Sequence, residues 1–152
     1  MPSWKYGVAT IIALLHDIVI PVGAFVALGR FYGTEIDLLF VSGILAILGY
    51  SVHDTIVVFD RVRENLRLND ETKNNEPFET TVGRSIKQTF VRSINTSLTL
   101  VITLVALYFI GSGATKDFSL LLIIGVLVGT YSSIFVASPL LVTLQKLQKG
   151  SK

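Results

Sequence analysis

Two aspartates interrupt long apolar stretches of the sequence, and each directly follows a histidine. The two pairs are His16-Asp17 and His53-Asp54. A charged side chain costs at least about 2.5 to 3.5 kcal/mol at the centre of a bilayer, so such residues usually face the protein interior and serve a pathway or a partner. The chemistry open to a buried carboxylate is uptake and release of a proton, which makes or breaks a charge pairing and can switch a helix arrangement.

Asp54 has polar neighbours that can share its face of a helix. Tyr50 and Ser51 precede it by four and three residues, which places both on its side of an α-helix and within hydrogen-bonding reach. His53 and Thr55 flank it directly. Together these side chains predict a polar face on an otherwise apolar helix.

Arg92 is the candidate partner of Asp54. It stands at the entry of a later apolar stretch, where its long side chain can extend outward to the headgroups or turn inward to meet a carboxylate. The inward orientation gives an ion pair that a proton on Asp54 would break. A static role, in which a buried carboxylate only fixes helix packing, also stays open.

The repeated His-Asp dipeptide raises two further alternatives, a metal site and a relay of two carboxylates. His16 and Asp17 lie about 12 to 14 Å into the first apolar stretch, whereas His53 and Asp54 lie about 8 to 9 Å from the same side. This offset and the divergence of adjacent side chains on a helix disfavour a shared metal. We therefore expect no metal and no cofactor, with protons as the coupling ion. For Asp17 we expect a hydrogen bond to a neighbouring helix.

Four apolar stretches must position these residues, at about 8–29, 38–59, 93–110 and 118–144. Each is long enough for a transmembrane helix, which needs roughly 20 residues. Of the 152 residues, 51% are hydrophobic and 16% charged, which argues against an ordinary soluble protein, and the lack of cysteine excludes thiol chemistry. The sequence predicts an all-α membrane protein, a four-helix transmembrane bundle forming one domain over residues 1–152.

The distribution of basic residues predicts the orientation of this bundle. With four spans, both termini and the central polar loop 60–92 fall on one side. Eleven of the 13 lysines and arginines lie on that side, and only Arg30 and Lys116 lie on the other. The positive-inside rule predicts a cytoplasmic loop with cytoplasmic N- and C-termini. The same bias accounts for the basic character of the chain, so we expect no binding of nucleic acid.

The central loop has its own helical pattern. The second span is expected to continue beyond the membrane as a protruding helix end. Pro77 suits the first turn of a further helix at about 76–91, in which Phe78, Val82, Ile86 and Phe90 recur every four residues as one apolar stripe. We expect this amphipathic helix to lie along the membrane surface before the chain turns into the third span.

The last two spans carry packing signals. Gly125, Gly129, Ser133 and Ala137 follow one another at four-residue spacing and predict a groove in which another helix approaches closely. The third span is unusually polar for a lipid-facing helix, with Ser93, Asn95, Thr96, Ser97, Thr99 and Thr103. We infer a polar interface between helices near the cytoplasmic half of the bundle.

Three ordered runs together resemble a known family. They are residues 49–65, which contain Tyr-Ser-Val-His-Asp, residues 92–99, which begin Arg-Ser-Ile-Asn-Thr-Ser, and residues 125–137, which contain Gly-Thr-Tyr-Ser-Ser. Leu15-His16-Asp17 also matches the family pattern. On these motifs the chain resembles the SecD/SecF family of bacterial protein-export membrane subunits, within the resistance-nodulation-division superfamily. The likeness is to the C-terminal four-span part of the SecF members.

The resemblance implies an accessory subunit of the Sec machinery. Such a subunit uses the proton-motive force to help move preproteins across the bacterial cytoplasmic (inner) membrane, with SecD and the SecYEG translocon as partners and YidC and YajC as further candidates. Asp54 matches the proton-sensitive aspartate of the family, and Arg92 matches the arginine that acts with it. The family usually has asparagine at the position of His53.

The resemblance also implies a longer protein. Family members have six spans and a large extracytoplasmic domain after the first, so we expect this chain to be a fragment, a split gene product or a truncated form. Two other functions stay open: a proton-coupled transporter of lipids or small molecules in the same superfamily, and a non-transporting scaffold, for which Asp54→Asn would be harmless. No nucleophile and base lie in register, so we do not expect an enzyme.

Overall fold

The computed structural model describes residues 4–33 and 36–149, and its elements are all helical. In chain order they are α1 (Trp4–Tyr32), α2 (Leu38–Glu71), α3 (Phe78–Ile110), α4 (Ala114–Ser132), the π-helix η1 (Ser133–Ala137) and α5 (Ser138–Lys149). Four helical segments are long and apolar enough to cross a membrane. The predicted all-α bundle with four membrane helices is confirmed.

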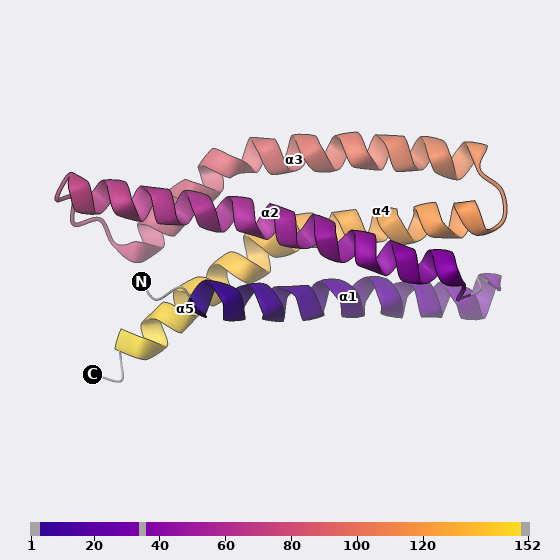
Figure 1. Cartoon of the computed structure of the whole chain (residues 1–152), viewed down its shortest axis with the longest axis horizontal. Helices are drawn as coiled ribbons and strands as arrows, with labels where there is room; N and C mark the ends of the chain where they lie inside the picture. Colours follow the sequence, from indigo (N-terminus) through magenta and orange to yellow (C-terminus); the bar gives the residue numbers. More distant parts are fainter. Residues whose placement is uncertain (1–3, 34–35, 150–152) are drawn as a thin grey trace.

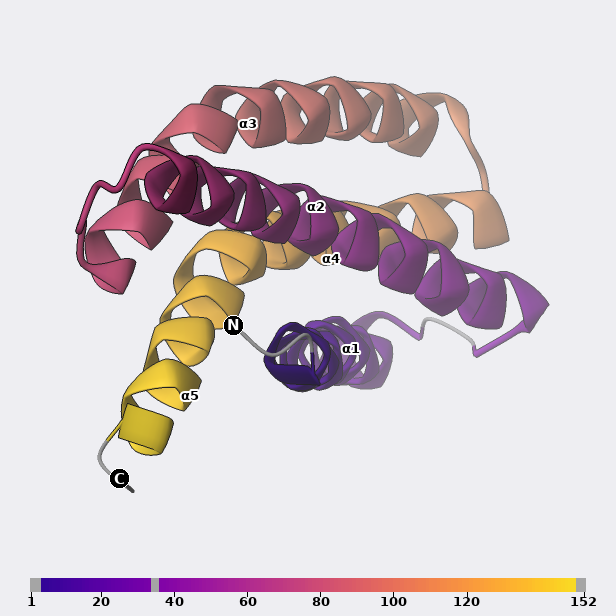
Figure 2. The ribbon, with the colours of Figure 1, turned by 60° about the vertical axis from the view of Figure 1, so that its left-hand side comes forward.

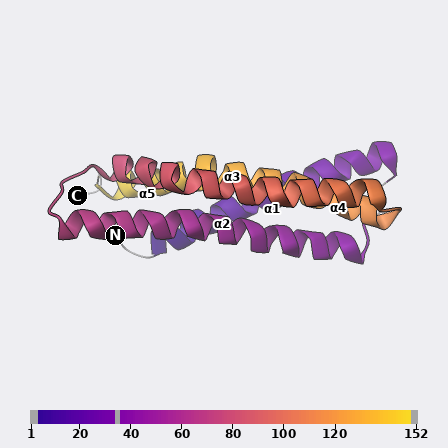
Figure 3. The same ribbon diagram turned by 90° about the horizontal axis from the view of Figure 1, so that it is seen from above.

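The four long helices lie side by side along the length of the molecule (Figures 1 and 3). The start of α1, the α2–α3 connection and the end of α5 lie at one end, and the other two connections lie at the opposite end (Figure 1). Helix α2 is central because it contacts α1, α3 and α4. Any side chain on its inner faces can therefore meet partners from three neighbours.

Helix α2 is longer than a bilayer is thick. Its 34 residues extend about 50 Å at 1.5 Å per residue, against a hydrocarbon core of about 30 Å. Asp37 caps its first turn, since the carboxylate accepts a hydrogen bond of 2.9 Å from the backbone N–H of Phe40. At the other end the helix runs on to Glu71, beyond the apolar stretch, as the expected protruding end.

Helix α3 differs from the prediction of a surface helix followed by a separate span. It is one continuous helix from Phe78 to Ile110, because no glycine or proline interrupts residues 84–110. Its first half packs against the last turns of α2. Asn65 donates to Ser85 Oγ at 2.8 Å and Asn69 donates to Thr81 Oγ1 at 2.9 Å, both bonds being buried. These polar contacts give the segment a protein partner.

The expected fourth span, 118–144, is divided by a π-helical segment that begins at Ser133. Helix α4 begins at Ala114, passes into η1 at Ser133 and continues as α5 from Ser138, and α5 diverges from the line of α4 (Figure 2). Pro139 has no N–H to donate to a carbonyl one turn earlier, which weakens the α-helical ladder at this point. π-Helical turns often accompany functional sites.

The apolar core has two parts. The larger part lies toward the end of the bundle with the α2–α3 connection and is called the inner core. In it, Val58, Phe59 and Val62 of α2 pack with Ala9, Ala13, Val82, Ala137 and Leu141. Toward the opposite end, Phe25, Ile47 and Leu121 form a smaller cluster. The buried polar residues Asp17 of α1, Asp54 of α2 and Ser133 of η1 lie between these two clusters along the chain.

Candidate functional site

Asp54 is a buried carboxylate held by two serine hydroxyls. The residue is only 7% exposed. Ser93 Oγ of α3 donates to Oδ1 at 2.8 Å, and Ser133 Oγ of η1 donates to Oδ2 at 2.5 Å. Three elements therefore meet at this carboxylate, and both of its partners are neutral groups.

Ser133 connects Asp54 to the π-helix. Its hydroxyl lies 2.5 Å from Asp54 Oδ2 and 2.9 Å from the carbonyl oxygen of Thr130. A hydroxyl has one proton to donate, so these two acceptors compete for it. Ser133 is also the first residue of η1. The Asp54 carboxylate is thus linked through one hydroxyl to the backbone where α4 ends.

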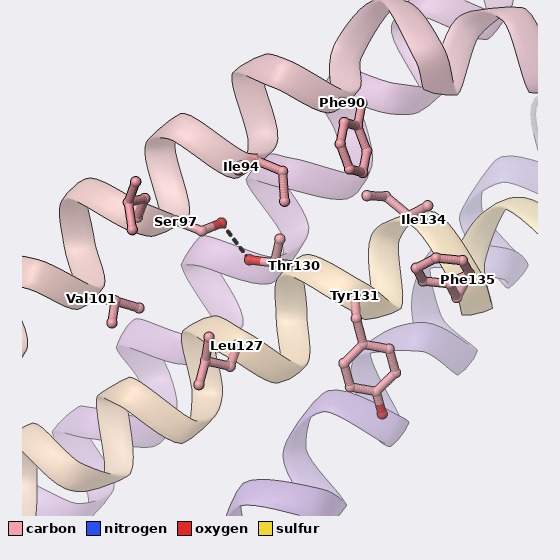
Figure 4. A pocket seen from close by; sticks show the side chains of 10 residues that line it. Phe90, Ile94, Ser97, Val101, Leu127, Thr130, Tyr131, Ile134 and Phe135 are labelled. Carbon is pink, nitrogen blue, oxygen red and sulfur yellow. Dashed lines mark hydrogen bonds between the residues drawn. The ribbon is translucent and has the colours of Figure 1, made fainter.

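Tyr50 does not bond to Asp54, contrary to the expectation from its spacing. Its hydroxyl lies 2.7 Å from Ser97 Oγ of α3 and 3.0 Å from Thr130 Oγ1 of α4. Ser97 and Thr130 are themselves 2.5 Å apart (Figure 4). Because the long phenol ring carries its hydroxyl away from its own helix, Tyr50 joins α2 to both neighbours.

An apolar cavity of about 410 Å³ lies next to this hydroxyl cluster, between α3 and the α4–η1 segment (Figure 4). Its walls include Phe90, Ile94 and Leu127, and Ser97 and Thr130 lie on its lining. The two hydroxyls bond to each other, so they present little polarity to the cavity. Phe90, the last residue of the predicted stripe, faces this space, whereas Phe78, Val82 and Ile86 pack in the inner core.

Asp17 forms a second buried site, with different partners. The residue is fully buried, and Ser51 Oγ of α2 donates to its Oδ2. His16 Nδ1 lies 3.0 Å from Asp17 Oδ1, and His16 Nε2 lies 2.8 Å from the hydroxyl of Tyr131 on α4. The expected hydrogen bond from Asp17 to a neighbouring helix is present, but it engages Ser51, which the spacing had assigned to Asp54.

The other predicted polar residues lie apart from the two carboxylates. His53, Arg92 and Thr96 are exposed on the bundle, and Thr55 is buried. Among the residues that the structure describes, Arg92 forms no ion pair with Asp54, whose oxygens are occupied by serines. In this arrangement the arginine side chain takes the outward of its two predicted orientations.

The small-residue stripe of α4 receives α2 at close range. A Cβ on Gly125 would overlap Ile47, and one on Gly129 would lie 3.4 Å from Ser51 Cβ. One turn further, Ser133 reaches Asp54, and Ala137 is fully buried in the inner core. The stripe thus sets the register that brings the hydroxyls of η1 to the carboxylate.

The α2–α3 hairpin outside the apolar stretches carries a third carboxylate cluster. Glu76 accepts hydrogen bonds from Asn69 at 3.0 Å and Thr81 at 2.9 Å, and pairs with Arg84 at 2.9 Å. The bonds from Asn69 and Thr81, followed by the charge of Arg84, hold the pKa of the Glu76 carboxyl below its usual value. This carboxylate is stabilised in its ionised form.

Sequence reasoning missed how Ser93, Ser97, Thr130 and Ser133 are used. It assigned Ser93 and Ser97 to a polar helix interface, and it expected the hydroxyls of Thr130 and Ser133 to bond to a helix carbonyl or to an unspecified partner. The available signal was the position of Ser93 and Ser97 at the start of the third span, on the same side as Asp54. Which carboxylate each hydroxyl meets depends on helix rotation, which spacing along one helix does not give.

Comparisons with known proteins identify the family of this chain. Residues 3–147 match the family described as "Protein export membrane protein SecD/SecF, C-terminal". The chain is 55% identical over 141 residues to protein translocase subunit SecF of Thermobaculum terrenum, an alignment that covers 92% of this chain and 43% of that protein. It is 40% identical over 150 residues to protein translocase subunit SecDF of Thermus thermophilus, covering 99% of this chain and 19% of that one.

A solved structure shows the same fold. The crystal structure of SecDF from Thermus thermophilus, described as a translocon-associated membrane protein, superimposes with a TM-score of 0.85 and 41% identity, covering 95% of this chain and 19% of that one. The chain spans less than half the length of the curated relatives compared here. It belongs to the SecD/SecF family of protein export membrane proteins and corresponds to their C-terminal membrane part.

Proposed function

We propose that this chain acts in the Sec protein-export machinery of the bacterial cytoplasmic membrane, where it couples the proton-motive force to preprotein translocation. SecD and the SecYEG translocon are the proposed partners, with YidC and YajC as further candidates. Support comes from family membership and from the name of the Thermus relative, in which one SecDF chain contains a segment similar to this one. The excess of lysine and arginine at the end of the bundle with the α2–α3 hairpin supports a cytoplasmic position for that end.

The observation that carries the proposal is the setting of Asp54. It is buried in a membrane helix and both of its oxygens accept from serine hydroxyls. A hydroxyl can donate to an ionised carboxylate and accept from a protonated one. The site can therefore hold Asp54 in both states, and the arrival of a proton removes a buried charge without requiring any other ion.

Ser133 supplies the proposed link from proton to motion. When Asp54 is ionised, the Ser133 proton is directed to Oδ2. When Asp54 is protonated, its own proton can be donated to Ser133 Oγ, and the Ser133 proton then bonds to the Thr130 carbonyl at 2.9 Å. This exchange changes the hydrogen bonding where α4 becomes η1, and so favours a different direction of α5. Apart from the O–H bond formed when the proton binds to Asp54, only hydrogen bonds are made or broken.

Arg92 has a proposed role in a second arrangement. It directly precedes Ser93, which donates to Asp54, and adjacent residues on a helix point about 100° apart. A rotation of α3 that withdraws Ser93 from Asp54 would bring the guanidinium toward the carboxylate. An ionised Asp54 would favour the guanidinium of Arg92 as its partner, whereas a protonated Asp54 would favour the neutral hydroxyl of Ser93.

The test is export of a preprotein into inverted membrane vesicles containing the full-length protein, SecD and SecYEG, with and without a proton gradient. We expect Asp54→Asn to lose the gradient-stimulated part of export and to keep the remainder. Asp60→Asn, an exposed aspartate on the same helix, is the matched control and should behave as wild type. Unchanged stimulation in Asp54→Asn would overturn the proton mechanism and favour a packing role.

A further inference from the structure

The proton mechanism proposed above uses Asp54 and leaves Asp17 without a role. Asp17 is fully buried in the interior of the bundle. It is surrounded by three side chains that can donate or exchange protons, since Ser51 donates to one oxygen and His16, itself bonded to Tyr131, lies at the other. A buried carboxylate in a membrane protein with a histidine beside it is a candidate for proton binding.

The contacts of α2 place the two carboxylates close together. Ser51, which bonds to Asp17, precedes Asp54 by three residues on the same helix. Residues at this spacing have Cβ atoms about 5 to 6 Å apart. The hydroxyl partner of Asp17 therefore lies one helical turn from Asp54 on α2.

The contacts of the α4–η1 segment give the same placement independently. Tyr131 bonds to His16 at the Asp17 site, and Ser133 bonds to Asp54. These two residues are separated by a single position in the sequence. Both α2 and the end of α4 thus contact each of the two carboxylate sites, and a change at one site is transmitted to the other through two packed helices.

We propose that Asp17 is a second proton-binding carboxylate, coupled to Asp54 across α2, with His16 as its proton exchanger. The proposal rests on the proposed function in taking Asp54 as the first proton site. Two buried negative charges bound at neighbouring turns of α2 oppose each other, because the surrounding protein screens them far less than water does. Protons therefore bind to the two carboxylates as a coupled pair and not independently.

His16 is suited to exchange protons with Asp17. Its side chain is 29% exposed, whereas that of Asp17 is fully buried. An imidazole can accept a proton at Nε2, on the Tyr131 side, and release one from Nδ1 to Asp17 Oδ1. The ring then ends as the other neutral tautomer and the carboxylate ends protonated. One proton has moved inward, and the charge of His16 is unchanged.

The titratable groups around the pair are few. Helix α1 contributes His16 and α4 contributes Tyr131. His53 of α2 and Arg92 of α3 are exposed. Lys5, which bonds to Gln145 of α5, lies twelve residues before Asp17, or about 18 Å along α1. The partners contributed by α3 and η1, Ser93 and Ser133, are neutral.

Infrared spectroscopy of the full-length protein in lipid tests the coupling directly, through the carbonyl stretch of protonated carboxyl groups as pH is varied. Subtraction of the spectrum of the Asp17→Asn, Asp54→Asn double variant isolates the two carboxyls. We expect wild type to titrate in two steps. Each single variant should titrate in one step, at a midpoint that differs from both steps of the pair.

Further variants make the result decisive. His16→Asn should slow proton exchange at Asp17, and His53→Asn is the matched control that should leave the titration unchanged. Ser51→Ala keeps both carboxylates and should move a titration step even if Asp17→Asn does not fold. The proposal is wrong if Asp17→Asn and Ser51→Ala both leave the steps and midpoints of Asp54 as in wild type.

The export assay separates this proposal from the proposed function. If Asp54→Asn leaves export unchanged while the infrared titration shows two coupled steps, the export mechanism fails and the coupled pair stands. If Asp54→Asn abolishes gradient stimulation while Asp17 shows no proton binding, the coupled pair fails and the export mechanism stands.

Discussion

The two His-Asp pairs have the same sequence and different surroundings. In the first pair, His16 bonds to its own aspartate and to Tyr131, and remains partly exposed. In the second pair, His53 points out of the bundle while Asp54 is buried between serines of α3 and η1. One pair is a chain of exchangeable protons, and the other is an isolated carboxylate at a helix junction.

This difference shows that the neighbouring helices, and not the dipeptide, determine the chemistry of each aspartate. Adjacent side chains on a helix point about 100° apart, so only one member of a pair can face the interior directly. On α1 the histidine still reaches Tyr131 of α4, whereas on α2 no described residue holds the histidine. Variants that disturb each environment separately can test this interpretation.

The largest effect is expected from Gly125→Val, which disturbs both sites together. A Cβ at this position overlaps the side chain of Ile47, so α4 must move away from α2. Overpacking of this kind costs about 1 to 3 kcal/mol, and it should lower the thermal unfolding temperature in detergent and abolish gradient-stimulated export. Gly49→Val is the control, since a Cβ there meets nothing within 4 Å. Equal stability of the two variants would contradict the close packing of α4 on α2.

An intermediate effect is expected from removing one hydroxyl at each site. Ser133→Ala and Ser51→Ala each remove a donor to a buried carboxylate, and a hydrogen bond to a charged group contributes about 1.5 to 3 kcal/mol. In the vesicle export assay, Ser133→Ala should reduce gradient stimulation roughly tenfold or more, because it removes the link to η1. Ser51→Ala should reduce it less, and Ser133→Thr should restore it. A larger loss in Ser51→Ala would reverse the proposed ranking of the two sites.

The smallest effect is expected at Glu76, a carboxylate that has a cation as well as neutral hydrogen-bond donors. Its pKa is lowered in the folded state, so its contribution to stability is present above its unfolded pKa of about 4.3. The contribution is lost as pH falls through the lower folded value. The protection of the α2–α3 hairpin against hydrogen exchange, relative to the intrinsic exchange rate at each pH, should therefore fall in wild type as the medium is acidified below about pH 4.

Two variants complete the test of Glu76. Glu76→Gln should show less of this acid sensitivity, because its side chain has no charge to lose. Glu79→Gln, an exposed residue paired only with Lys146, should retain it. Identical acid sensitivity in wild type and Glu76→Gln would show that the Glu76–Arg84 cluster does not stabilise the hairpin.

Much of the fold could be predicted because the membrane imposes helix length and composition. The four apolar stretches and the protruding end of α2 follow from hydropathy and from the lack of helix-breaking residues. The path of residues 78–92 could not be predicted, because an apolar stripe packs equally well on a membrane surface or on another helix. The π-helix at Ser133 also escaped prediction, although Pro139 marks a weak point of the helical ladder.

The candidate site was predicted in part. The two aspartates are evident because an ionisable residue in an apolar stretch is rare, and the small residues of α4 indicated close packing. The neighbours expected for Asp54 were assigned wrongly, whereas the hydrogen bond expected between Asp17 and a neighbouring helix is present. Tyr50 and Ser51 share a helix with Asp54, but they bond to groups on α3, α4 and α1, because side chains of neighbouring helices are nearer to them than Asp54 is.

The sequence by itself determined the family, the four membrane helices and the two buried acidic positions, because each of these depends on residue type and on spacing along the chain. Only the tertiary structure decided which hydroxyl meets which carboxylate, that Arg92 points outward, and that Asp17 bonds to α2 one helical turn from Asp54. These features depend on the rotation and register of one helix against another. That register is set by the contact of Gly125 and Gly129 with α2, which no single helix specifies alone.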